Sequence, residues 1–160
     1  MKENCFKNMN NQSDNKPGYL FYIGIDCGVN TGVCVWDGKT RKMIHLSTTT
    51  ILQAINFVSG FCENNGDTVF VRVEDARLRK WIPRQKNESA ERGRREGAGS
   101  VKRDAQIWEE FLTSKGIPHE FVAPKNNRTK MDAEYFRKIT GWAGKTNSHS
   151  RDAAALVIGI

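Results

Sequence analysis

Carboxylate side chains stand at three places along this chain where a run of apolar residues ends or begins. Asp26 ends the first such run, Glu74 ends a valine-rich second run, and Asp152 opens the apolar tail. The first two runs are typical of buried strands and the third of the first turn of a helix. A fold that brings the three places together makes an acidic cluster, which bound divalent cations would neutralise. This pattern is typical of enzymes that hydrolyse phosphodiesters with metal ions.

The chemistry explains why carboxylates are needed at these positions. Phosphodiester hydrolysis uses two divalent cations roughly 3.5–4 Å apart, and magnesium takes oxygen ligands such as Asp and Glu. If the strands that end at Asp26 and Glu74 lie side by side and parallel, both carboxylates emerge at the same edge of the sheet. His149 and Asp152 are three residues apart in the expected last helix and therefore share one face. The sequence thus predicts four metal ligands from three separate segments.

Each of these residues also has a structural explanation. An Asp after a strand is commonly a turn residue, a His at a helix start commonly lies on the surface, and Asp152 could simply complement the helix dipole. Glu74 and Asp75 point to opposite sides of a strand, so at most one is a primary ligand, and Glu74 is preferred. The sequence leaves open whether Asp75 assists it. The prediction depends on the combination.

Positive charge is concentrated in one part of the chain. The 160 residues carry a formal net charge of +7, and residues 77–103 alone contain ten basic and three acidic residues, which give the same surplus. Cationic side chains displace counterions from a nucleic-acid backbone, so this stretch is expected to bind phosphates. The alternative is a solvated basic loop.

The remaining composition describes one ordinary domain. Residues 1–18 are expected to be a flexible N-terminal lead-in, and residues 19–160 a single domain. No run approaches the roughly 18 apolar residues of a membrane span, and no hydrophobic signal core is present. The four cysteines show no zinc-binding spacing, so reduced thiols and a cytoplasmic location are expected.

Apolar periodicity predicts a mixed α/β layout in the order β-β-β-α-β-α-β-α-α. The first half is expected to hold strands over 19–27, 33–37 and 42–47, a helix from 48–50 to near 66 and a strand over 68–73. A long basic loop to about 95 follows, then a helix to 116 and a strand over 118–122. The chain is expected to end with a helix after a capping box at Thr129 and Asp132 and a last helix from about 148.

In this order the residues resemble the RuvC-type Holliday junction resolvases of the RNase H-like nuclease superfamily, over residues 20–160. The matching stretches are Gly24-Ile25-Asp26-Cys27-Gly28 through Gly32, Glu74, Gly93 and Gly97, Ala123-Pro124-Lys125, Lys130, and His149-Ser150-Arg151-Asp152-Ala153-Ala154-Ala155-Leu156. The last stretch matches the family's terminal motif, which has His or Asp first and Asp fourth.

The resemblance implies an RNase H-like fold, with a central mixed five-stranded sheet flanked by helices. It implies metal ligation by Asp26, Glu74, His149 and Asp152, and it places Lys125 and Lys130 near the scissile phosphate. The implied enzyme is a homodimer that cuts branched DNA, in particular four-way junctions, with two Mg²⁺ or Mn²⁺ ions per site. The imidazole ligand leans the choice slightly toward manganese.

Two departures from the family pattern concern DNA recognition. The family often carries an aromatic side chain shortly after the Glu that ends the fourth strand, and Arg77 stands at that place, with Trp81 as the nearest substitute. The loop from Arg77 to Gly93 is also longer and more basic than the family pattern. The residues expected to contact DNA are Arg77, Arg79, Lys80, Trp81, Arg84, Arg92, Arg94, Arg95, Lys102 and Arg103.

Three other functions compete with junction resolution. The Gly24–Gly28 stretch also resembles the first phosphate loop of actin-like ATPases, but those need two lobes and have no use for the terminal His-x-x-Asp. A binding module without turnover would not need all four site residues. An RNase H-like nuclease acting on RNA, flaps or forks uses the same metal chemistry and stays open.

Overall fold

The computed structural model describes residues 18–79, 87–124 and 130–160. Its centre is one five-stranded sheet with the strand order β3-β2-β1-β4-β5. The strands are β1 (Phe21–Asp26), β2 (Thr31–Asp37), β3 (Lys42–Thr49), β4 (Val69–Glu74) and β5 (His119–Val122). β1, β2 and β3 pair antiparallel, whereas β1 with β4 and β4 with β5 pair parallel. The sheet is therefore mixed, as the sequence predicts.

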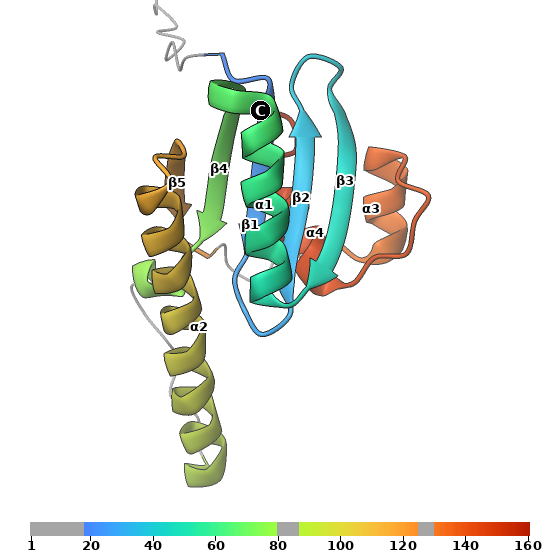
Figure 1. Cartoon of the computed structure of the whole chain (residues 1–160). Helices are drawn as coiled ribbons and strands as arrows, with labels where there is room; N and C mark the ends of the chain where they lie inside the picture. Colours follow the sequence, from blue (N-terminus) through green and yellow to red (C-terminus); the bar gives the residue numbers. More distant parts are fainter. Residues whose placement is uncertain (1–17, 80–86, 125–129) are drawn as a thin grey trace, which may run out of the picture.

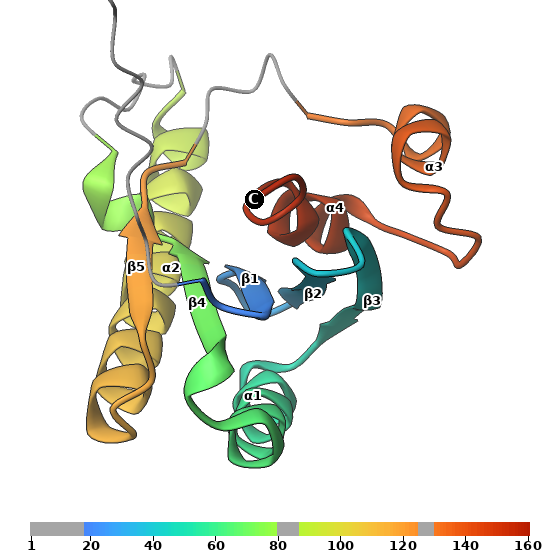
Figure 2. The same cartoon turned by 90° about the horizontal axis from the view of Figure 1, so that it is seen from above.

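Helices cover both faces of the sheet. They are α1 (Ile51–Asn65), α2 (Glu88–Ser114), α3 (Ala133–Thr140) and α4 (Ser148–Ala155), with short 3-10 turns η1 (Gly66–Thr68) and η2 (Ala76–Leu78). Figure 2 shows α1 and α2 on one side of the sheet and α4 on the other, with α3 beyond α4. In the described ranges, no helix is both long and apolar enough to cross a membrane.

Two hydrophobic cores follow from this layering. The first lies between the sheet and α1 and α2, and includes Val71, Val58 and the fully buried Trp108. The second lies between the sheet and α3 and α4, and includes Trp36 and the fully buried Phe136. Because both faces are covered, β2 is buried along almost its whole length and β1 over its last four residues, whereas β4 alternates between buried and half-buried residues.

Local capping explains most of the helix boundaries. Thr50 caps α1 in a capping box with Gln53, so the predicted start of this helix is confirmed. The predicted capping box at Thr129 and Asp132 is wrong, because Asp132 itself is the N-cap and its carboxylate accepts a hydrogen bond of 2.7 Å from the Tyr135 amide. Thr129 lies outside the described residues.

The long basic loop expected before residue 95 is also wrong in part. Helix α2 begins at Glu88, capped by Asn87, and its first half extends well past the end of the sheet at which β1 and β4 finish (Figure 1). Gly93, Gly97 and Gly99 lie inside this helix with no other atoms within 4 Å of the position of an added Cβ. Glycine is unfavourable within helices, so these residues hid the helix from the sequence pattern.

Candidate active site at the carboxyl end of the sheet

Asp26 and Glu74 are the last residues of two adjacent parallel strands and lie directly opposite each other in the register of β1 and β4. Neighbouring strands are about 4.8 Å apart, so the two backbones carry their side chains out of the sheet at one place. We call this place the carboxyl end of the sheet. Figure 1 shows that the β1–β2 turn and the start of α1 lie at the same end.

Helix α4 reaches the carboxyl end because two strand glycines let its backbone approach. A Cβ on Gly32 would lie 2.1 Å from the His149 carbonyl oxygen, and a Cβ on Gly24 would lie 2.1 Å from the Ala153 carbonyl oxygen. No side chain fits in either place. Sequence reasoning treated these residues only as motif members, although glycine within a strand is itself a signal of close backbone approach.

The start of α4 is fixed by its cap. The Asn147 side chain accepts a hydrogen bond of 3.0 Å from the Ser150 amide and one of 2.8 Å from the Thr48 hydroxyl of β3. The cap thus ties the first turn of α4 to the edge of the sheet. This contact joins residues 99 positions apart, so it could not be read from local sequence.

Contacts between side chains then join the predicted site residues. His149 Nδ1 lies 2.9 Å from Asp26 Oδ2, and the nearly buried carboxylate accepts the hydrogen bond. Lys130 Nζ lies 3.5 Å from Asp152 Oδ2 on the adjacent turn of α4. Five of the six predicted catalytic residues therefore come from segments that meet here, whereas Lys125 lies outside the described residues.

The carboxylates also influence one another electrostatically. Burial, followed by the negative charges of Asp26 and Asp152, raises the pKa of Glu74 to about 7, against smaller opposing effects of Arg79 and Lys130. Burial also raises the pKa of Asp26, although the hydrogen bond and charge of His149 act to lower it. The negative charges of the cluster repel one another, and a bound cation would reduce this repulsion.

The donor set fits divalent cations, although the side chains pair with one another. Within the ranges 18–79, 87–124 and 130–160, no group of three or more His, Cys, Asp or Glu side chains is arranged to hold a metal ion. His149 and Lys130 each engage a carboxylate oxygen that a cation would otherwise use. Three carboxylates and one imidazole at one place are nevertheless ligands suited to Mg²⁺ or Mn²⁺.

Asp75 has a different task from Glu74. It is only 2% exposed, and its carboxylate accepts hydrogen bonds from the Arg77 backbone amide at 2.8 Å and from the Arg77 guanidinium. That guanidinium also contacts Glu109 of α2 at 2.7 Å and lies over the Phe121 ring of β5. Arg77, which we expected to contact DNA, thus joins η2 to α2 and β5. Asp75 is the buried carboxylate that binds its guanidinium.

The other predicted DNA-contacting residues divide into three groups. Arg79, Arg92, Lys102 and Arg103 have exposed side chains, and Arg92 pairs with Glu96 one helical turn away. Arg94 and Arg95 lie in α2, and Lys80, Trp81 and Arg84 lie outside the described residues. In the exposed group, Arg79 follows η2, Arg92 lies in the first half of α2, and Lys102 and Arg103 lie near the middle of that helix.

The structure of T. thermophilus RuvC in complex with a Holliday junction substrate is similar to this chain. The TM-score is 0.58 at 17% identity, over 86% of this chain and 90% of that one. The chain has an RNase H-like fold. The expected fold class, a mixed five-stranded sheet with flanking helices, is confirmed.

Two structures of the large terminase nuclease from thermophilic phage G20c, one with bound magnesium, match less well. Their TM-scores are 0.37 and 0.39 at 17% identity, over 67% and 79% of this chain and 46% and 52% of theirs. No protein-family model matches the sequence, and no curated protein does.

Proposed function

We propose that this protein is a metal-dependent endonuclease that cuts branched DNA, with the four-way junction as its main substrate. The observation that carries the proposal is the contact between His149 and Asp26, which joins the start of α4 to the end of β1 beside Glu74. Residues from three distant segments meet where β1 and β4 end. The similarity in fold to RuvC, solved on a Holliday junction, supports DNA as the substrate class.

In this proposal Asp26, Glu74 and Asp152 hold the divalent cations and His149 completes the ligand set. Bound cations supply an activated hydroxide and stabilise charge on the attacking and leaving oxygens. Lys130, now 3.5 Å from Asp152, lies where its ammonium can turn from the carboxylate to a phosphate oxygen. Lys125 is assigned the same task by the family resemblance alone.

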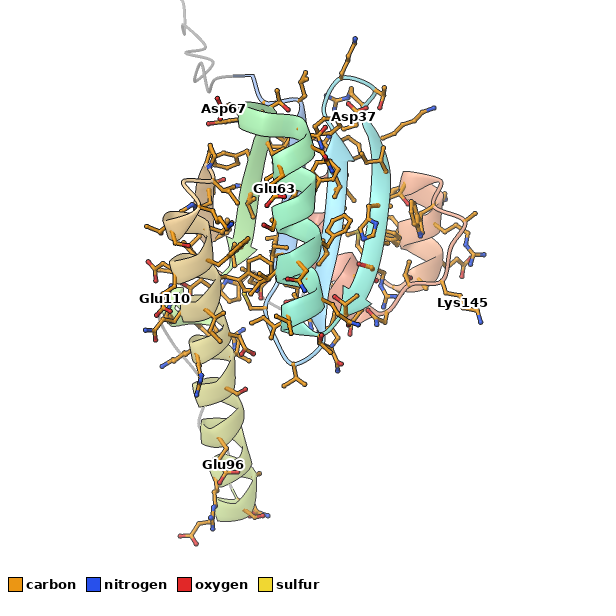
Figure 3. The ribbon with its side chains drawn as sticks, in the orientation of Figure 1. Asp37, Glu63, Asp67, Glu96, Glu110 and Lys145 are labelled. Atoms are coloured by element: carbon orange, nitrogen blue, oxygen red, sulfur yellow. The ribbon has the colours of Figure 1, made fainter. Side chains whose placement is uncertain are left out.

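A cation beside the carboxylates favours the carboxyl end of the sheet for DNA. The charge of the exposed Arg79 opposes the rise in the pKa of Glu74, so it acts close to the cluster. Figure 3 shows Asp37 and Asp67 at the opposite end of the molecule, where exposed cations of the β2–β3 turn (residues 38–41) lie beside Asp37. The attraction of a polyanion to the carboxyl end therefore depends on cations near the cluster.

We also propose that the enzyme acts as a homodimer. One chain carries one carboxylate cluster, and symmetric cleavage of a four-way junction requires two cuts in strands of equal polarity. A dimer with two such sites meets this requirement.

A cleavage assay on an equimolar panel tests the proposal. The panel contains a four-way junction, a flap, a linear duplex and an RNA–DNA hybrid, each with Mg²⁺ or Mn²⁺. We expect the junction to be cut fastest and EDTA to stop the reaction. Asp26→Asn should remove cleavage and leave junction binding intact, whereas Asp67→Asn, at the opposite end, should change neither.

Two results would contradict the proposed nuclease, and a third would contradict only its proposed substrate. Turnover by Asp26→Asn in magnesium would remove this residue from the mechanism. If the wild-type protein cleaved none of the substrates with either metal, the protein would not be a nuclease of this kind. Faster cleavage of the hybrid or the flap than of the junction would keep the nuclease and change its substrate.

A further inference from the structure

A hollow of about 260 Å³ lies between α3 and the segment that joins it to α4. Its lining includes Phe136, Arg137, Trp142, Gly144, Lys145 and Thr146. Among these lining residues the charged side chains, Arg137 and Lys145, are both cationic. The hollow therefore combines an indole with two cations, and none of the described residues that line it carries a carboxylate.

We propose that this hollow binds one nucleotide of the DNA strand near the cut. The phosphate would lie between Arg137 and Lys145, and the base would stack on the Trp142 indole. This inference rests on the proposed nuclease function and names a contact that the carboxylate cluster does not supply. Stacking on an aromatic side chain contributes roughly 1–3 kcal/mol per base and tolerates any sequence.

The chain around Trp142 is built to hold the indole in place. Gly141 has a left-handed φ of 68° and ends α3, and the Trp142 amide then donates a 3.1 Å hydrogen bond to the Thr140 hydroxyl. A Cβ on Gly144 would lie 2.7 Å from Trp142 Nε1, so only glycine lets the segment fold back over the ring. The indole contacts the second core and also lines the hollow.

Hydrogen bonds connect the segments around the hollow to α4, the helix that carries His149 and Asp152. The Arg151 guanidinium of α4 donates hydrogen bonds to the Met131 carbonyl oxygen at 2.8 Å and to the Thr146 hydroxyl at 3.0 Å. These bonds connect the segments before and after α3 to α4. The residue that follows Thr146 is the N-cap Asn147.

The distance to the cluster is a few nucleotides at most. Lys145 precedes His149 by four residues, so their Cα atoms are at most about 14 Å apart. A DNA strand advances about 3.4 Å along the duplex axis per nucleotide, which makes this span about four steps. Figure 3 shows Lys145 on the connecting segment with its side chain directed away from the body of the molecule, where a strand could reach it.

Binding of a fluorescein-labelled ten-nucleotide oligo(dT) in EDTA tests the cations without cleavage. The variant Arg137→Glu/Lys145→Glu should bind at least tenfold more weakly. The slope of log K against log [salt] should be smaller by about 0.7, because the one phosphate that lies between the two cations contributes about that much in a single strand. The matched control Lys39→Glu/Lys138→Glu has the same change in charge, from exposed residues outside the lining. An equal loss in both variants would overturn the proposal.

Intrinsic fluorescence tests the indole. In a Trp81→Phe background, which removes the other indole expected to contact DNA, oligo(dT) should quench the emission. Adding Trp142→Phe, which keeps an aromatic ring for packing, should remove most of that quenching. Quenching that survives in Trp142→Phe would overturn the stacking contact. Titration with dTMP and with inorganic phosphate separates a strand from free small molecules: if either binds within tenfold of oligo(dT), the hollow serves a small ligand and the proposal is wrong.

The test is independent of the proposed function. Junction cleavage that continues in Arg137→Glu/Lys145→Glu, with unchanged oligo(dT) binding, overturns the nucleotide hollow and leaves the nuclease intact. Absence of wild-type cleavage overturns the nuclease, and the oligo(dT) measurements still decide whether the hollow binds a strand.

Discussion

The charge of Glu74 destabilises the metal-free protein, and replacing Glu74 with Gln should stabilise it. Burial and the charges of Asp26 and Asp152 raise the pKa of Glu74 from 4.5 to about 7. The folded state therefore binds the proton more tightly than the unfolded state does. Stability from this group is fully present below about pH 4.5 and is lost as the pH rises through 7.

The magnitude follows from the same values. At 1.36 kcal/mol per pH unit, a pKa of about 7 instead of 4.5 corresponds to an upper limit of about 3.4 kcal/mol at pH 8. Glu74 is only partly buried, so solvent screening reduces this to about 1–2 kcal/mol. For a chain of this length, the melting temperature of Glu74→Gln in EDTA should rise by about 2–6 °C at pH 8.

Thermal unfolding in EDTA at pH 4.5 and pH 8 measures the effect. We expect the Glu74→Gln increase at pH 8 to vanish at pH 4.5, and added Mg²⁺ to stabilise the wild type more than the variant. Glu63→Gln is the matched control, because Glu63 is exposed at the opposite end (Figure 3). A Glu74→Gln variant that is less stable than the wild type at pH 8 would refute the electrostatic reasoning.

Three further predictions test the framework. Gly32→Ala should displace α4, lower the free energy of unfolding and stop cleavage. The control Gly60→Ala, in open space within α1, should raise the free energy of unfolding by about 0.5–1 kcal/mol. Equal effects of the two substitutions in urea unfolding would contradict the close approach of α4 to Gly32. Arg77→Ala should lower the free energy of unfolding by about 2–4 kcal/mol, because it leaves the 2%-exposed Asp75 carboxylate without its cation. This is less than the loss expected for a fully buried ion pair. An unchanged free energy of unfolding in the same assay would show that the pair is dispensable. Lys130→Ala should slow junction cleavage while changing stability by less than about 1 kcal/mol, since the ammonium is exposed; an unchanged rate would exclude it from the mechanism.

The fold was predictable because its signals are local. Apolar runs that end in carboxylates, the Asp37-Gly38 turn and the Thr50 cap all act within a few residues, and the structure places strands and helices accordingly. The part of α2 before about residue 95 was missed because its glycine and charges mimic a loop. Its start depends on the Asn87 cap, which has no apolar pattern beside it.

The site was predictable only in outline. Sequence order indicated that Asp26 and Glu74 share a sheet edge, but the pairing of His149 with Asp26 spans 123 residues and depends on backbone approach at Gly32. The engagement of Arg77 by Asp75 depends on their burial beside α2, which charge counting does not reveal. Long-range packing decides such contacts.

Diffraction at the manganese absorption edge, from crystals grown with MnCl₂ and a non-cleavable junction, tests the central claim most directly. The account predicts anomalous peaks between the carboxylates of Asp26, Glu74 and Asp152, within direct bonding distance of each, and none in Asp26→Asn crystals. Peaks elsewhere on the molecule, or none at the carboxyl end of the sheet at saturating manganese, would contradict it.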